Sequence, residues 1–184
     1  MKTLIIHPSD STTDFLRKVY TGLKCSVVST ELSEDDLSEM ITAHDRVIFL
    51  GHGTALGLLG WGRIVFHSGL VNVLKDNREN MFIWCNADEF VAKHHLQGFF
   101  TGMFISEPLE ARIYRVDASI EQINTSNNLF ARLLHNALSA QSTMNQILEQ
   151  LKAQYSSPDC EVTTFNSRRL YYADRTRPQQ TTNI

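Results

Sequence analysis

An almost continuously apolar run lies in the N-terminal half of the chain: Arg46-Val47-Ile48-Phe49-Leu50. A run without alternation of apolar and polar residues is typical of a central strand in a parallel sheet that is covered on both faces. A second run of this kind, Met81-Phe82-Ile83-Trp84-Cys85, follows after one excursion and one predicted helix. We therefore predict that the two runs are neighbouring strands of one parallel sheet.

The segments on either side alternate between strand and helix signals. Short strands are predicted at 3–7 and 25–29, and further strands at 99–106 and 162–172. Helices are predicted over 14–23, 34–43, 68–76, 86–97, 108–113, 124–138 and 144–155. The Gly-rich segment 56–67 is interpreted as a hairpin or loop excursion beside the sheet. This order predicts an α/β fold with a mostly parallel central sheet and helices on both faces.

Composition sets limits on domain number and partners. The chain has 184 residues, of which 42% are apolar and 20% charged, values typical of one globular domain. We expect a single domain over 1–173 and a polar tail over 174–184. The net charge of −3 and the lack of a Lys/Arg cluster predict neither nucleic acid nor a membrane as a partner. No apolar run suits a signal peptide or a membrane span, so the expected location is cytoplasmic. The oligomeric state stays open.

The three cysteines, Cys25, Cys85 and Cys160, are far apart in the sequence. This spacing argues against a disulfide framework and against a metal-binding knuckle, so free thiols are expected.

Reactive side chains follow three of the predicted strands. His7, His52 and Cys85 stand where strands end, and the carboxyl ends of parallel strands form the functional crevice of open α/β sheets. His52 lies between two glycines, which let a ligand approach the backbone closely. Cys85 immediately precedes a predicted helix, whose N-terminus would favour the thiolate. A cysteine that ends a buried strand is also commonly an inert core residue.

Two motifs carry a family resemblance: Phe49-Leu50-Gly51-His52-Gly53-Thr54 and Phe82-Ile83-Trp84-Cys85-Asn86-Ala87. A strand ending in His-Gly, followed by a strand ending in Cys and then a helix, resembles the caspase-like cysteine peptidases. That clan includes caspases, metacaspases, gingipains, clostripain, separases and CHAT domains. The resemblance covers about residues 3–110 and implies a caspase-like three-layer sandwich, a relative of the flavodoxin-like fold.

The resemblance also implies roles for individual residues. His52 would be the general base and Cys85 the nucleophile, with the backbone N–H groups of Gly53 and Cys85 as the oxyanion hole. Basic-specific members hold an acidic residue in the substrate pocket, for which Asp10 and Asp88 are candidates. Trp84 departs from the small residue usual before the nucleophile, so its side chain either packs into the sheet or partly fills the cleft.

The expected function is thus a cysteine hydrolase, a peptidase acting on a peptide or protein, with no cofactor and no metal. Two alternatives stay open. One is a non-catalytic module of the same fold, because a fold alone does not imply catalysis. The other is a metal-binding protein, in which His7, His52 and Cys85 converge as zinc ligands.

Overall fold

A computed structural model describes residues 1–74, 79–156 and 160–174 of the chain. These residues form an α/β structure around a six-stranded sheet with the strand order β2-β1-β3-β7-β8-β9. The strands are β1 (Thr3–Ile6), β2 (Ser26–Val28), β3 (Arg46–Leu50), β7 (Met81–Ile83), β8 (Gly98–Thr101) and β9 (Leu170–Ala173). The pairs from β2 to β8 are parallel and only β9 is antiparallel to its neighbour. The predicted mostly parallel sheet is confirmed.

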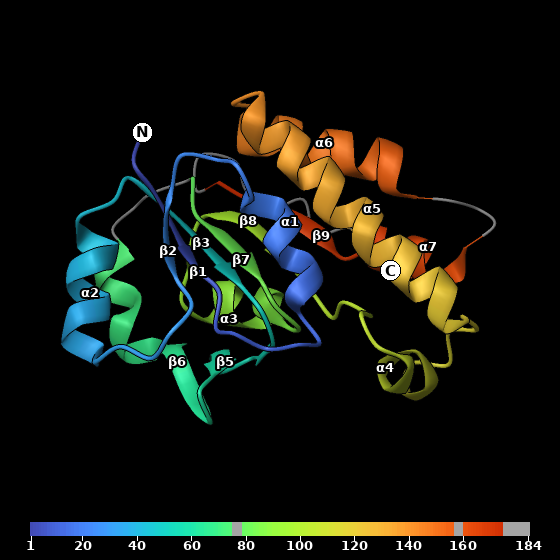
Figure 1. Cartoon of the computed structure of the whole chain (residues 1–184), viewed down its shortest axis with the longest axis horizontal. Helices are drawn as coiled ribbons and strands as arrows, with labels where there is room; N and C mark the ends of the chain where they lie inside the picture. The colour runs from blue at the N-terminus through green and yellow to red at the C-terminus, as the bar shows by residue number, and fades with distance from the viewer. Residues whose placement is uncertain (75–78, 157–159, 175–184) are drawn as a thin grey trace.

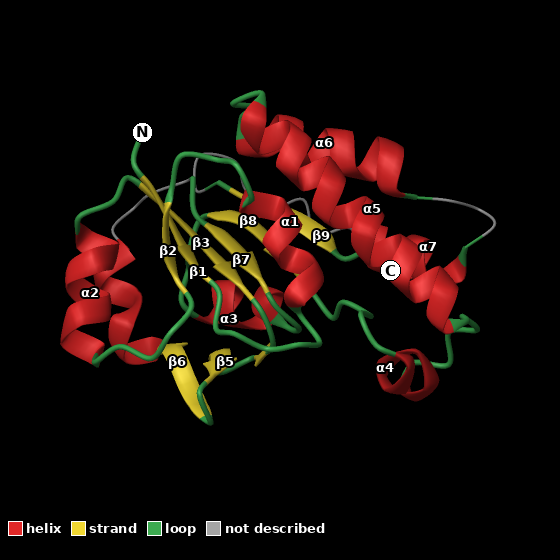
Figure 2. Cartoon of the chain, in the orientation of Figure 1, coloured by secondary structure: helices red, strands yellow, loops and turns green. Residues whose placement is uncertain are grey.

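Helices cover both faces of this sheet (Figure 1). One face packs against η1 (Asp14–Leu16), α1 (Arg17–Tyr20), α5 (Ile120–Ser139) and α6 (Met144–Tyr155). The other face packs against α2 (Glu34–Thr42), η2 (Ser68–Leu74) and α3 (Ala87–Lys93). All five residues of β3 are buried, because both faces of a central strand are covered. Figure 2 shows the red helices on either side of the yellow sheet.

A small antiparallel sheet forms the predicted excursion and projects beside the carboxyl ends of the main strands (Figure 1). Its strands are β4 (Gly53–Thr54), β5 (Gly57–Gly60) and β6 (Arg63–His67). Trp84 attaches it to the main sheet, since the indole N–H donates to the Thr54 carbonyl at 3.1 Å. A Cβ on Gly53 would lie only 2.1 Å from the Trp84 side chain. Only glycine fits there.

A separate, smaller hydrophobic cluster lies around α4 (Pro108–Ile113) and α7 (Glu161–Ser167). Asn166 is fully buried and bridges three groups. Its amide accepts from the Ile105 N–H at 2.8 Å and donates to the Ile105 carbonyl at 2.9 Å and to the Tyr155 hydroxyl at 3.1 Å. These bonds tie α7 to the segment that follows β8.

The prediction of a strand over 162–172 is wrong in its first half, because residues 161–167 form α7 and only Leu170–Ala173 form a strand. The β-branched residues there gave a strand signal, but propensity is weak against tertiary contacts, here those of Asn166. The strand predicted over 99–106 is too long, because β8 ends at Thr101. The remaining boundaries differ less. The helix predicted over 14–23 is a 3-10 turn followed by α1, that over 68–76 is the 3-10 helix η2, and that over 86–97 shortens to α3. Apart from Asp174, the predicted tail lies outside the described residues.

Among the described residues, no helix is both long enough and apolar enough to cross a membrane.

Candidate functional site

His52 and Cys85 follow two adjacent parallel strands in matching register. In the pairing of β3 with β7, Leu50 lies opposite Ile83, and the Gly51 N–H bonds to the Ile83 carbonyl at 3.1 Å. Continuing this register by two residues places His52 opposite Cys85. Gly51 makes the turn out of β3 with a φ of 144°, a conformation that favours glycine. The prediction that the two runs are neighbouring parallel strands is confirmed.

Both side chains belong to the wall of one narrow cavity at this edge of the sheet. The cavity has a volume of about 20 Å³, enough for about one water molecule. Its walls come from the ends of β3, β7 and β8, the first helical segment and α5. The lining residues are Thr13, Phe15, Leu16, Gly51, His52, Ile83, Trp84, Cys85, Thr101, Phe104, Ser106 and Phe130. The structure therefore brings His52 and Cys85 to the wall of one cavity, which is too small for a substrate.

Cys85 sits in a turn after β7, where Asn86 adopts a left-handed conformation with a φ of 64°. The Cys85 Sγ lies 3.4 Å from the Phe104 carbonyl oxygen and 3.7 Å from Glu110 Oε1. Burial, and then the negative charge of Glu110, raise the pKa of the Cys85 thiol to about 12. The thiolate expected from the helix N-terminus is not favoured in this environment, because desolvation and a nearby carboxylate both oppose it.

Glu110 is held beside Cys85 by its role at the start of α4. Its Oε2 accepts from the Ser106 N–H at 2.7 Å, the Ser106 hydroxyl at 3.1 Å and the Glu107 N–H at 3.0 Å. Together with Glu107 it forms a capping box, in which a side chain satisfies the free N–H groups of the first turn. The segment from β8 to α4 thus delivers a fixed carboxylate to the nucleophile candidate.

His52 is contacted by the loop between β1 and η1. Its Nε2 lies 2.5 Å from the Thr12 hydroxyl oxygen. Thr12 in turn donates to Asp10 Oδ1, from its hydroxyl at 2.6 Å and from its backbone N–H at 2.8 Å. In the described parts of the chain, no hydrogen bond engages His52 Nδ1. One ring nitrogen is therefore held, and the other is available.

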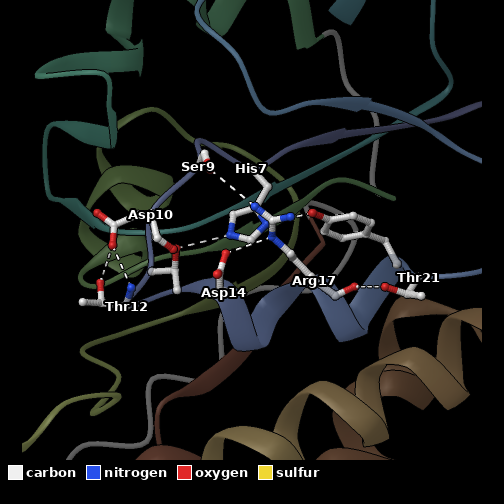
Figure 3. A network of polar contacts seen from close by, with 9 residues as sticks. His7, Ser9, Asp10, Thr12, Asp14, Arg17 and Thr21 are labelled. Carbon is white, nitrogen blue, oxygen red and sulfur yellow. Dashed lines mark hydrogen bonds and ion pairs between the residues drawn. The ribbon is translucent and has the colours of Figure 1, made fainter.

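His7 anchors the same loop through hydrogen bonds (Figure 3). The Thr13 hydroxyl donates to the Asp10 carbonyl at 3.3 Å, so at its 3.3 Å contact with His7 Nε2 it accepts. His7 Nδ1 then accepts from the Tyr20 hydroxyl at 3.0 Å. Burial, followed by the charge of Arg17, lowers the pKa of His7 to about 4. His7 is thus a neutral structural histidine.

These contacts bear on the alternative in which His7, His52 and Cys85 meet as metal ligands. His7 bonds to Tyr20 and Thr13 instead. Across 1–74, 79–156 and 160–174, no group of three or more His, Cys, Asp or Glu side chains is placed to hold a metal ion.

A second, larger depression opens on the other side of His52. It has a volume of about 560 Å³ and lies between the β1–η1 loop and the small sheet. Its lining residues are Pro8, Ser9, Asp10, Thr13, His52, Leu59, Gly60, Trp61, Gly62, Arg63 and Ile64. We call this the hairpin groove. It is large enough for a side chain or a short peptide segment, and His52 belongs both to it and to the narrow cavity.

The predicted pocket residues fall in different places. Asp10 lines the hairpin groove, but Asp88 does not: its carboxylate lies in the first turn of α3, near Gly102, where burial raises its pKa. The Trp84 side chain is almost fully buried and packs against Phe49, Phe82 and Phe90. Of the two alternatives for Trp84, the structure therefore shows the first: its indole packs into the sheet.

The backbone donors expected of an oxyanion hole are free of the small sheet. Gly53 lies opposite Leu58, and the Leu59 N–H bonds to the His52 carbonyl at 2.8 Å. This pattern makes Gly53 a non-hydrogen-bonded position, so its N–H points away from β5. In the described parts of the chain, the Cys85 N–H donates to no backbone carbonyl.

Sequence reasoning missed Thr12 and Glu110 as members of this site. Segment 9–13 has the composition of a turn and a helix cap, and a Glu three residues after Glu107 matches a capping pattern. Such signals describe local structure. They do not say which remote side chain the same group touches.

The sequence matches no protein-family model and no curated protein. One similar solved structure is the Trp repressor binding protein from Bacillus subtilis, with 11% identity, a TM-score of 0.37, and coverage of 68% of this chain and 99% of that one. Another is the RcsB response regulator of Salmonella typhimurium, with 11% identity, a TM-score of 0.33, and coverage of 90% and 97%. Likenesses this weak carry no argument about family or function.

Proposed function

We propose that this protein is a cytoplasmic cysteine hydrolase of the caspase-like type that cleaves peptide bonds with a His52/Cys85 dyad. The observation that carries the proposal is the register of β3 with β7, which brings the His-Gly and Cys motifs to one edge of the sheet and one cavity. Reactive groups at the carboxyl ends of parallel strands are the usual origin of α/β active sites.

In the proposed reaction, the Cys85 thiol proton moves to the His52 ring and the resulting thiolate attacks the carbonyl carbon of the scissile bond. The carbonyl electron pair moves to its oxygen, and the N–H groups of Gly53 and Cys85 stabilise that oxyanion. The C–N bond then breaks, and the leaving amine takes the proton from His52. Water, deprotonated by His52, hydrolyses the thioester and restores the thiol.

The closed structure is a resting state in this proposal. The cavity beside Cys85 holds about one water molecule, and Glu110 opposes thiolate formation. Substrate entry therefore requires the segment from Phe104 to α4 to move away from Cys85. The hairpin groove, which already reaches His52, would receive the substrate chain.

The same observations favour a second candidate function, a non-catalytic binding module of this fold. A buried thiol with a raised pKa is what an inert core cysteine shows, and the hairpin groove could bind a partner without chemistry.

An unbiased peptide library separates the two functions when it is offered to the wild type and to Glu110→Gln, which removes the opposing charge. Cleavage that is lost in Cys85→Ala and in His52→Gln supports the hydrolase. The opposite outcome has two parts: neither the wild type nor Glu110→Gln cleaves any peptide, and adding His52→Gln to Glu110→Gln leaves the rate of Cys85 alkylation unchanged. Both together would exclude the dyad and leave the binding module.

A further inference from the structure

Three side chains from two separate segments form a continuous chain of short polar contacts. The Asp10 carboxylate accepts the Thr12 hydroxyl proton at 2.6 Å, and the Thr12 hydroxyl oxygen lies 2.5 Å from His52 Nε2. The first two residues come from the β1–η1 loop, whereas His52 follows β3. Nothing in the register of the sheet requires this contact, so it needs a separate explanation.

The direction of each hydrogen bond follows from counting protons. A hydroxyl group has one proton, and an ionised carboxylate can only accept. Because the Thr12 proton is directed at Asp10 Oδ1, the Thr12 oxygen can only accept from His52. His52 must then carry a proton on Nε2, and in the neutral ring Nδ1 is the unprotonated nitrogen.

We propose that Asp10 and Thr12 are positioning residues that hold His52 in the Nε2–H tautomer and so assign Nδ1 as the nitrogen that accepts a proton. The role in catalysis rests on the proposed function, but the tautomer itself does not. A base of this kind needs both a fixed ring plane and a defined free nitrogen. The contacts from Asp10 through Thr12 to His52, which we call the relay, supply both.

The relay suits both protonation states of the ring. When Nδ1 takes up a proton, Nε2–H still donates to Thr12, so no bond has to break. Asp10 then lies one hydroxyl away from the imidazolium and compensates its charge. The hydrogen bonds from Thr12 lower the pKa of Asp10, which keeps this carboxylate ionised and acting as an acceptor.

The contact is not needed to hold the loop. The Thr13 hydroxyl and N–H bond to the Asp10 carbonyl, and the Thr13 hydroxyl also contacts His7. Arg17 reaches back to the Ser9 hydroxyl at 3.4 Å (Figure 3). These bonds do not involve the Thr12 side chain. Removing its hydroxyl therefore leaves the loop anchored but takes away the hydrogen-bond partner of His52 Nε2.

The test is ¹⁵N NMR of the histidine rings in the intact protein, in a Cys85→Ala background, at about pH 8.5, where an ordinary imidazole is neutral. His52→Gln assigns the His52 signals. We expect a protonated Nε2, an unprotonated Nδ1, and an Nε2 proton protected from exchange with water. Thr12→Ser should retain that protection and Thr12→Val should lose it.

Asp10 offers a second matched pair. Asp10→Asn keeps a carbonyl acceptor for the Thr12 proton and should preserve the signals. Asp10→Ala frees that proton to bond to Nε2, so the Nδ1 and Nε2 resonances of His52 should converge or exchange places. The signals of His7 serve as a folding control, because its partners are Tyr20 and Thr13.

The positioning role would be overturned if His52 in the Cys85→Ala parent were protonated on Nδ1. It would also be overturned if adding Thr12→Val to that parent left the His52 spectrum unchanged. Because the background lacks the nucleophile, this result does not depend on any turnover. The expected spectra together with a failed library experiment would instead reject the hydrolase and keep the relay.

Discussion

Glu110 Oε1 lies 3.7 Å from the Cys85 thiol, and the carboxylate is fixed there because it caps the first turn of α4. The residue that caps the first turn of α4 therefore also suppresses the ionisation of the proposed nucleophile. Helix capping and control of the thiol are two consequences of one side chain.

Glu110→Gln should make Cys85 more reactive. Glutamine still offers an acceptor oxygen to Ser106 and Glu107, but it removes the charge that raises the pKa of the thiol. Each unit by which that pKa falls increases the thiolate fraction about tenfold. Peptide-resolved iodoacetamide labelling at about pH 8 measures the rate, with Cys25 and Cys160 as internal references. An unchanged Cys85 rate would mean that burial alone controls the thiol.

Acidification should destabilise the protein through His7. Its pKa is lowered to about 4 in the fold, against about 6.5 in the unfolded chain. Its contribution is therefore fully present above about pH 6.5 and is lost as the pH falls towards 4, to an extent of roughly 3 kcal/mol. Urea unfolding between pH 7 and 4.5 measures this loss. In His7→Gln the pH dependence over that window should shrink, even if the variant is less stable at pH 7.

Gly53→Ala should destabilise the attachment of the small sheet. The new Cβ would lie 2.1 Å from the Trp84 side chain and 2.8 Å from the Gly57 carbonyl oxygen, and overpacking of this kind costs about 1–3 kcal/mol or more. Gly102→Ala is the control, because its nearest neighbours lie at 3.3 Å. Thermal unfolding should rank the two variants, and a Gly53→Ala protein as stable as the control would contradict the close packing of Trp84.

Asn166→Ala should cost about 3 kcal/mol of unfolding free energy. It leaves the buried N–H and carbonyl of Ile105 without their partner, and each such group costs about 1–3 kcal/mol. Asn145→Ala removes an exposed amide that bonds to Glu149 and should change stability by no more than about 0.5 kcal/mol. Equal losses in the two variants would contradict the role of Asn166 in placing α7.

If the hydrolase is active, Asp10 should set a preference for Arg or Lys before the scissile bond. Its carboxylate lines the hairpin groove beside His52, and a guanidinium or ammonium group is its natural partner. In the peptide library, Asp10→Asn should reduce the ratio of basic to neutral residues cleaved. Asp88→Asn should not, because Asp88 lies outside the groove. Wild-type cleavage after acidic residues would exclude this assignment.

The pairing of the two central strands could be predicted from the sequence alone. The continuous apolar runs at 46–50 and 81–85 predicted two buried neighbouring strands, and the structure pairs them in parallel. Ser33, with Asp36 three residues later, matches the capping pattern at the start of α2, and its hydroxyl oxygen accepts from the Asp36 N–H at 3.1 Å. These features are local, because hydrophobic periodicity and capping depend on residues within a few positions of one another.

The chemical state of the site depends on contacts that form only in the folded chain. The pKa of Cys85 depends on burial and on Glu110, 25 residues further along the chain, and His52 depends on Thr12, 40 residues before it. Likewise, the helix at 161–167 depends on bonds between Asn166 and Ile105, 61 residues apart. Desolvation and charge act through space, so the spacing of residues along the chain does not encode them.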